Sequence, residues 1–430
     1  MRRSLLNQFL VGLLACSRAC NKLYSFVGTC FGMLTVSFAV DRFVSTRKHR
    51  APCILFVQFT NPGAYPPLHH SARILAQAGW EVRVLATEDF ESGVLRFPST
   101  PGICVTKLPF LPGMAFRKLH YVWFCIRAVW AAIRWRASWV YASDLPSYPA
   151  ALVASMLIGK RVILHEHDSP APTPAPTLLT RFLFFTRTRL AHRAVLNILP
   201  NHARAHAFQK QTGAKSVCVV WNCPSLTEIA EPESLPHEGF VLYYHGNISS
   251  SLLPLTVIEA LKLLPEDVLL LIIGYETVGH IGYNDTIRET AARLGVSDRV
   301  FVKRPVARFE LFNASRQADV GLALFPVPTG PANSYAGASN KVFDYLCCGM
   351  PVLVTDSPEW NSFFSGEGCS VPCNPADPLS ISQAISKLYQ DRTLLRAMGE
   401  RGKRRILSGW NYEAQFSPVL KLLNSSRETN

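Results

Sequence analysis

Apolar residues gather in short runs that alternate with helical patterns along most of the chain. The first run covers 53–59, and a loop rich in proline and glycine, 61–67, separates it from a helical pattern over 68–78. Another apolar stretch with residues on one face follows at 81–86. Strand, helix and strand in this order predict a βαβ unit and a parallel, doubly wound sheet.

The same alternation continues in two series that are separated by a stretch without apolar periodicity. Residues 228–239 are acidic and contain Pro232 and Pro236, so we expect an interdomain linker there. The first series adds predicted strands at 139–142, 161–164, 194–198 and 216–220. The second predicts strands at 240–244, 269–273, 299–302, 319–325 and 351–355, with helices at 256–264, 285–294, 308–318 and 341–348.

This pattern predicts an α/β protein in which two Rossmann-like domains face each other across a cleft. A length of 430 residues agrees, since a domain usually has roughly 100–200 residues. Ligands in such folds lie at the carboxyl ends of strands, where we expect the functional residues. The predicted parts are a hydrophobic and basic extension at 1–50, an N-terminal Rossmann-like domain at 51–227, the linker, a C-terminal Rossmann-like domain at 240–410 and a tail at 411–430.

The extension contains an uncharged stretch, 23–40, between basic flanks. Its 18 residues are diluted by Ser, Thr and Gly, which places it at the lower limit for crossing roughly 30 Å of hydrocarbon. Three interpretations stay open: a marginal or interfacial membrane segment, a cleaved signal, or a segment upstream of the fold.

Composition narrows the classes of partner. Lys and Arg outnumber Asp and Glu by 44 to 30, which gives a formal charge of +14 and suits an anionic partner. We find no DNA- or RNA-binding motif, so nucleic acid is not expected. The twelve cysteines include no CxxC pair to hold zinc, and we interpret them as reduced thiols.

The most informative motif is a glycine- and proline-rich loop, 326–337, that leads into a predicted helix. With Ser339 or Asn340 as the cap, free backbone N–H groups and the helix dipole would face an anion such as a diphosphate. Lys341 adds a positive charge, and Asp344 can accept hydrogen bonds from two vicinal hydroxyls such as those of ribose. The alternative is an ordinary capped helix with both side chains in solvent.

This motif resembles the signature of GT-B glycosyltransferases related to family 4, in which a phrase like Asn340-Lys-Val-Phe-Asp-Tyr345 precedes Gly-x-Pro-Val. Tyr244-His-Gly-Asn247 resembles the strand-end loop that opens their donor domain, and 61–67 with 76–82 resembles their first loop and helix. The likeness covers about 52–410. It implies a GT-B fold and a hexosyltransferase-type enzyme that uses a nucleoside-diphosphate sugar.

The resemblance implies a set of donor-binding residues and two departures. Many relatives carry two glutamates, of which the second would fall on Asp344 and holds ribose, whereas the first, which touches the donor sugar, would fall on Ala336. The loop 247–253 also lacks the Arg or Lys with which relatives often clamp the diphosphate, so a nearby cation or the helix amides must compensate. The expected donor-binding residues are Gly246, Asn247, Arg304, Ser339, Asn340, Lys341 and Asp344.

The strand predicted at 161–164 ends in four ionisable residues, where an acceptor hydroxyl would meet the donor. They are the catalytic candidates: a general base in an inverting enzyme, or groups that position the acceptor and stabilise an oxocarbenium ion in a retaining one. A metal site is not expected, because a strand alternates its faces, and no cofactor is expected beside the sugar nucleotide. These candidates are His165, Glu166, His167 and Asp168, with Asn61 and Gly63 in the acceptor-side loop.

Two basic and aromatic stretches, 117–136 and 181–189, suit a lipid headgroup boundary. The alternative is that their aromatic residues are core and their arginines are solvated. We therefore expect a lipid-linked or glycan acceptor, an anionic membrane surface, and a position at the cytoplasmic face of a membrane, peripheral or anchored by 1–50.

The sequence thus predicts a glycosyltransferase of cell-surface glycan synthesis. A non-catalytic GT-B scaffold or sugar-binding subunit is the alternative that Ala336 and the uncharged loop after Gly246 would explain, and a nucleotide-sugar epimerase is the second. No GxGxxG follows a first strand and no GxxxxGK[ST] occurs, which argues against a dehydrogenase and a P-loop ATPase.

Overall fold

The computed structural model describes residues 51–88, 95–109, 114–170, 175–229, 237–276, 279–327 and 334–428. The predicted extension 1–50 and most of the predicted linker, 230–236, lie outside these residues. No helix in the described ranges is both long enough and apolar enough to cross a bilayer. Residues 51–430 form one unit, to which all the elements below belong.

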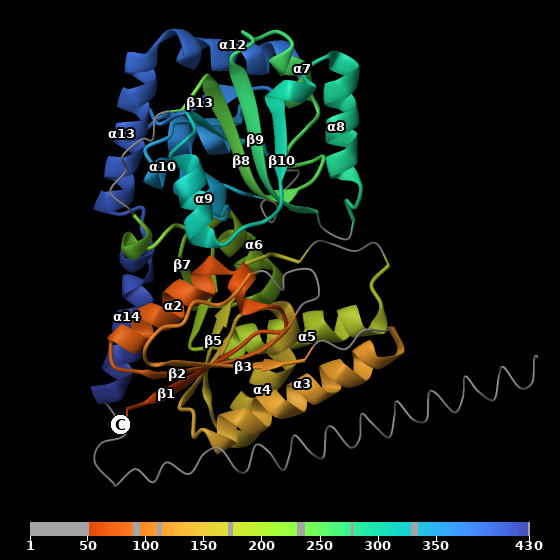
Figure 1. Cartoon of the computed structure of the whole chain (residues 1–430). Helices are drawn as coiled ribbons and strands as arrows, with labels where there is room; N and C mark the ends of the chain where they lie inside the picture. The colour runs from red at the N-terminus through yellow and green to blue at the C-terminus, as the bar shows by residue number, and fades with distance from the viewer. Residues whose placement is uncertain are drawn as a thin grey trace, which may run out of the picture. The chain divides into compact units, whose positions relative to one another are not determined.

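The first half of this unit is a seven-stranded parallel sheet in the order β3-β2-β1-β4-β5-β6-β7 (Figure 1). The strands predicted from apolar runs are confirmed, whereas β3 went unpredicted because it is a half-exposed edge strand with a weak apolar pattern. The strands are β1 (Cys53–Val57), β2 (Glu81–Thr87), β3 (Ile103–Leu108), β4 (Trp139–Ala142), β5 (Arg161–His165), β6 (Leu196–Leu199) and β7 (Val217–Val219). The helices are α2 (Pro66–Gln77), α3 (Met114–Arg134), α4 (Tyr148–Ile158), α5 (Leu178–Arg193) and α6 (His202–Thr212).

The second half is a six-stranded parallel sheet in the order β10-β9-β8-β11-β12-β13. Together the two sheets confirm the predicted α/β fold with two Rossmann-like domains. The strands are β8 (Phe240–Ile248), β9 (Val268–Glu276), β10 (Val300–Lys303), β11 (Val320–Ala323), β12 (Val352–Thr355) and β13 (Ser370–Cys373). The helices are α7 (Thr256–Leu261), α8 (Tyr283–Leu294), α9 (Arg308–Ser315), α10 (Asn340–Cys347), α11 (Pro358–Trp360), α12 (Pro378–Gln390), α13 (Arg392–Ser408) and α14 (Tyr412–Glu428).

Alternating residues of each strand supply two separate cores, as the pleat of a sheet requires. In β1, Ile54 and Phe56 face the core that contains α2, while Leu55 and Val57 face the core that contains α3, α4 and α5. Both sides of the sheet are therefore covered, which explains why these strands are nearly continuous apolar runs. The second sheet is arranged alike, with α10 on one face and α7, α8 and α12 on the other.

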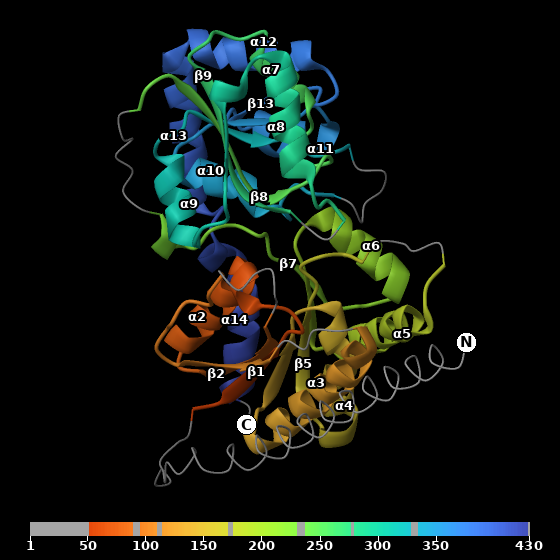
Figure 2. The ribbon, with the colours of Figure 1, turned by 45° about the vertical axis from the view of Figure 1, so that its right-hand side comes forward.

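The C-terminal stretch that the sequence predicts as a tail is the helix α14, which returns to the first half of the unit (Figure 2). Tyr412, Phe416, Val419 and Leu423 are buried at helical spacing. The helix packs on α2 and β7, and the Tyr412 hydroxyl lies 2.8 Å from Ser71 Oγ. The chain thus passes from the first sheet to the second and then returns to the first through α14.

Candidate functional site

A cavity of about 1060 Å³ lies where the carboxyl ends of strands from both sheets meet. This is the position at which doubly wound folds bind ligands. The predicted residues that line it are Gly63, His167, Asp168, Gly246, Asn247, Ser339, Asn340, Lys341 and Asp344. Four predicted residues do not line it: Asn61, His165, Glu166 and Arg304.

These four residues have identifiable places outside the cavity. Asn61 caps the short helical turn Pro62–Ala64, since its side chain accepts from Gly63 N at 3.1 Å and thereby shapes the loop that does line the cavity. His165 is fully buried. Arg304 is exposed to solvent and is not among the cavity-lining residues.

The side of the cavity that carries the predicted donor-binding residues is built by the end of β8 and the start of α10. Gly246 and Asn247, expected in a loop, are residues of β8, which runs on to Ile248. Ser339 occupies the N-cap of α10 but its side chain makes no capping hydrogen bond. First-turn N–H groups have no partner within a helix, so this end of α10 offers donors to an anion.

Lys341 adds a positive charge at the same place. Its Nζ lies over the Tyr244 ring at 5.2 Å, and a Cβ at Gly246, where φ is +100°, would be 3.3 Å from that Nζ. The ammonium forms no ion pair with the described residues, and burial lowers its pKa to about 8. An incompletely solvated cation beside open N–H groups is an arrangement that can attract an anion.

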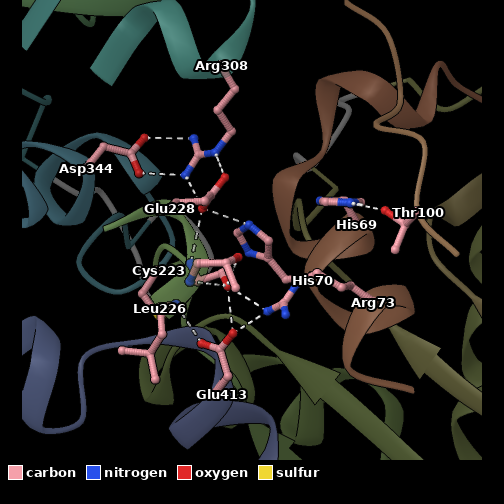
Figure 3. A network of polar contacts seen from close by, with 12 residues as sticks. His69, His70, Arg73, Thr100, Cys223, Leu226, Glu228, Arg308, Asp344 and Glu413 are labelled. Carbon is pink, nitrogen blue, oxygen red and sulfur yellow. Dashed lines mark hydrogen bonds and ion pairs between the residues drawn. The ribbon is translucent and has the colours of Figure 1, made fainter. Parts of the chain in front are cut away.

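Asp344 is held by a charged network that Figure 3 shows. Arg308 Nη1 and Nη2 donate to the two carboxylate oxygens of Asp344 at 3.0 and 2.8 Å. Arg308 also donates to Glu228 through Nε at 2.5 Å and through Nη2 at 3.1 Å. Burial raises the pKa of Asp344, and Arg308 opposes that rise.

The network continues to the first half of the unit. Glu228 Oε2 lies 2.9 Å from His70 Nε2 and accepts from Ser225 N at 3.1 Å. Ser225 Oγ accepts from Arg73 Nη2 at 2.6 Å, and Arg73 also pairs with Glu413 of α14. Burial acts to raise the pKa of Glu228, but Arg308 and His70 outweigh it and hold that pKa well below its usual range.

The predicted catalytic residues after β5 separate into two environments. His167 and Asp168 line the cavity. His167 Nε2 lies 2.9 Å from Ser143 Oγ, and burial lowers the pKa of His167 to about 3, so its imidazole is neutral. The Asp168 side chain is accessible to solvent, and desolvation by the surrounding protein raises its pKa while Arg204 lowers it.

Glu166 instead belongs to a buried ion pair. Arg187 of α5 donates to its two oxygens at 2.5 and 2.8 Å, and the side chains of Glu166 and Arg187 are 1% and 4% exposed. His165 Nδ1 contacts the Tyr141 hydroxyl at 2.7 Å. The described residues contain no group of three or more His, Cys, Asp or Glu placed to hold a metal ion.

Comparison with known proteins agrees with this geometry. Residues 256–421 match the model of a glycosyl transferase-like family. D-inositol 3-phosphate glycosyltransferase from Xylanimonas cellulosilytica is 28% identical over 194 residues, which is 44% of this chain and 43% of that protein. The chain is thus similar to group 1 glycosyltransferases over part of its length, and it has the GT-B fold. The match therefore spans less than half the length of this relative.

Solved structures share this GT-B fold. Sucrose-phosphate synthase from Thermosynechococcus elongatus superimposes with a TM-score of 0.69 at 14% identity, covering 88% of this chain and all of that one (100%). HepE from Anabaena, solved in complex with UDP, gives a TM-score of 0.66 at 18% identity, covering 86% of this chain and 99% of that one.

In this GT-B chain, Ala336, where the resemblance places the first family carboxylate, is buried in protein. Ala336 is 3% exposed, and its N–H donates to Glu359 Oε1 at 3.2 Å. Asn201 Nδ2 donates to the Ala336 carbonyl at 2.8 Å, and Asn222 N donates to the Gly337 carbonyl at 2.8 Å. Two residues that follow strands β6 and β7 of the first sheet thus hold the backbone that leads into α10.

Sequence reasoning missed Arg204, Arg308 and Glu228. Arg204 lines the cavity and donates to the Ser334 carbonyl at 2.8 Å and to the His167 carbonyl at 3.2 Å. Arg308 and Glu228 were assigned to a helix and a linker without a role. Their partners are distant in sequence, so no local pattern marks them. The acidic character of the linker was the one available signal.

Proposed function

We propose that this chain transfers a sugar from a nucleoside-diphosphate sugar to an acceptor hydroxyl. One observation carries the proposal: a single cavity has the uncapped start of α10 and Lys341 on one side and Asp168 on the other. The first pair suits the diphosphate, and Asp344, one helical turn further on, suits the ribose. HepE, a structural neighbour, is solved in complex with UDP, which supports a nucleotide donor.

The proposed step needs only these groups. The acceptor oxygen forms a bond to the anomeric carbon while the bond from that carbon to the diphosphate oxygen breaks. The bonding electron pair leaves on the diphosphate, which Lys341 and the N–H groups of α10 stabilise. The acceptor proton passes to the Asp168 carboxylate or to the departing diphosphate. Burial raises the pKa of Asp168, which makes this carboxylate a stronger base.

The outer surface of α3, α4 and α5 supports a lipid-linked acceptor and an anionic membrane surface as partners. Figures 1 and 2 show these helices side by side on one face of the first sheet. Each carries a stripe of exposed apolar side chains at helical spacing. The stripes are Leu119, Val122, Ile126 and Ile133 on α3, Val153, Met156 and Leu157 on α4, and Leu178, Leu179, Phe182 and Phe185 on α5.

Basic side chains accompany these stripes, among them Arg117 and Lys118 on α3 and Arg181 and Arg189 on α5. An apolar surface with basic residues around it fits the boundary of an anionic bilayer. The composition differs from the expectation, because Phe124 of α3 is buried and the exposed residues there are aliphatic. With an acceptor presented at a membrane, the enzyme would act in cell-surface glycan assembly.

Calorimetry with the full-length chain tests the donor part of this proposal. UDP and GDP are titrated into wild type, Asp344→Asn and Asp298→Asn, the last replacing an exposed carboxylate outside the cavity. We expect one nucleotide to bind wild type and Asp298→Asn alike, and to bind Asp344→Asn about tenfold more weakly, since a charge-assisted hydrogen bond contributes about 1.5–3 kcal/mol. The absence of binding by wild type would refute the proposal.

Turnover is measured separately, as release of nucleoside diphosphate from the matching sugar nucleotide with a lipid-extract acceptor. We expect Asp168→Asn to bind the donor normally and to lose most of the turnover. Donor binding by wild type without turnover would favour the scaffold or sugar-binding alternative. Turnover without an acceptor that yields an isomerised sugar nucleotide would favour the epimerase.

A further inference from the structure

The carboxylate of Asp344 is fixed more firmly than a binding carboxylate usually is. Its side chain is 5% exposed, and the guanidinium fork of Arg308 contacts both of its oxygens. A carboxylate has about four lone-pair sites, so the fork leaves about two for a ligand. His245 Nε2 lies 3.6 Å from Asp344 Oδ2, beyond hydrogen-bond distance, and burial lowers the pKa of His245, so its imidazole is neutral. Asp344 lines the cavity, where a ligand can reach these sites.

The fork of Arg308 is itself fixed from the opposite side. Its Nε and Nη2 bond to Glu228, and Glu228 is bound by Ser225 N and His70, both of which precede the second sheet. Figure 3 shows the resulting row from Asp344 through Arg308 and Glu228 to His70. A bidentate pair adds directional restraint as well as energy. The orientation of the Asp344 carboxylate therefore depends on residues that are distant from it in the sequence.

We propose that Arg308, supported by Glu228, makes this site selective for ribonucleotides by holding the Asp344 carboxylate as a double acceptor for the 2′ and 3′ hydroxyls of the donor. The proposal rests on the proposed nucleotide-sugar function and adds a positioning residue to it. Two fixed acceptor sites match two neighbouring hydroxyl donors, whereas a 2′-deoxyribose leaves one site without a partner in a buried place. Leaving such a group unpaired is what makes hydrogen-bonding sites discriminate strongly.

Arg308 has a second effect on the same carboxylate. Burial raises the pKa of Asp344, and the paired guanidinium counteracts this and favours the ionised form. A protonated carboxyl would have one donor and fewer acceptor sites, so it would match the diol less well. Loss of the fork thus weakens both the orientation and the charge of the acceptor. A lysine at position 308 would keep the charge but lose the fork.

The test compares ribo- and 2′-deoxyribonucleotides on the full-length chain. UDP and dUDP, and GDP and dGDP, are titrated into wild type, Arg308→Lys, Glu228→Gln and the control Arg288→Lys, which replaces a solvent-exposed arginine of α8. For the base that binds, we expect wild type and Arg288→Lys to prefer the ribose form by about 10- to 100-fold. In Arg308→Lys we expect a ratio of about 1 to 3, with residual affinity from Lys341 and the α10 start.

Glu228→Gln serves as the second variant, because it keeps the shape of the network and removes one charge. We expect it to lower the ribose preference several-fold, and circular dichroism checks that both variants are folded. A ribose preference equal to that of wild type in Arg308→Lys, or in Glu228→Gln if Arg308→Lys does not fold, would overturn the inference while leaving nucleotide binding intact. A wild type that binds none of the four nucleotides would instead refute the proposed function, and the inference with it.

Discussion

The buried pair of Glu166 and Arg187 allows a quantitative prediction about a residue that the sequence presents as a catalytic candidate. Both side chains are almost fully buried, and two hydrogen bonds of 2.5 and 2.8 Å join them. Glu166→Gln keeps the volume but leaves the guanidinium without a counter-charge. Removing one partner of a buried pair costs about 3–5 kcal/mol of unfolding free energy.

This cost converts into a measurable melting shift. For a domain of about 150–250 residues, 1 kcal/mol corresponds to about 2–4 °C, so Glu166→Gln should lower the Tm of the first domain by about 6–20 °C. Differential scanning calorimetry of the full-length chain measures this. The control Glu88→Gln, at an exposed carboxylate of the same domain, should stay within about 0.5 kcal/mol of wild type.

The double variant Glu166→Gln with Arg187→Met tests whether the lost stability comes from the unpaired charge of Arg187. Replacement of both charges by neutral groups is often close to neutral for stability, so it should recover most of the lost Tm. The reasoning would be refuted if Glu166→Gln had the same Tm as wild type but abolished sugar transfer. Such a result would return Glu166 to the catalytic residues, despite its position away from the cavity.

Three further predictions concern the proposed donor site, its support and the apolar outer surface of α3, α4 and α5. Burial lowers the pKa of Lys341 to about 8, so the affinity for a nucleoside diphosphate should stay constant below pH 8 and fall as the pH rises through 8. Calorimetry on Lys341→Met should show binding that is weaker and nearly independent of pH. Gly337 has φ +78°, and a Cβ there would lie 3.1 Å from the Pro200 carbonyl oxygen. Gly337→Ala should therefore lower the free energy of unfolding by about 1–2 kcal/mol through backbone strain alone, and it should weaken nucleotide binding. An unchanged Tm and an unchanged affinity would contradict this prediction. The double variant Leu157→Asp with Phe182→Asp changes exposed positions of α4 and α5. It should reduce sedimentation with vesicles rich in anionic phospholipid at least tenfold, while UDP and GDP binding stays at the wild-type level. Sedimentation equal to that of wild type would exclude this surface as the membrane contact.

The local pattern alone was enough to predict the elements that carry the proposed donor-binding residues. Apolar runs located β1, β5 and β8, because strands covered on both faces must be apolar along their length. The loop chemistry before α10 and its helical period placed Lys341 and Asp344 one turn apart on the helix.

Only the tertiary structure decided which partners these residues have. Arg308, Glu228 and Asp344 come from three segments, and their contact depends on how successive βαβ units wind and on where the chain crosses between the sheets. The return of α14 and the pairing of Glu166 with Arg187 are likewise long-range. Propensity and periodicity act over a few residues, whereas burial and ion pairing depend on every element that surrounds a position. For that reason the sequence determined the sheets and the start of α10, and the fold determined which carboxylates face the cavity.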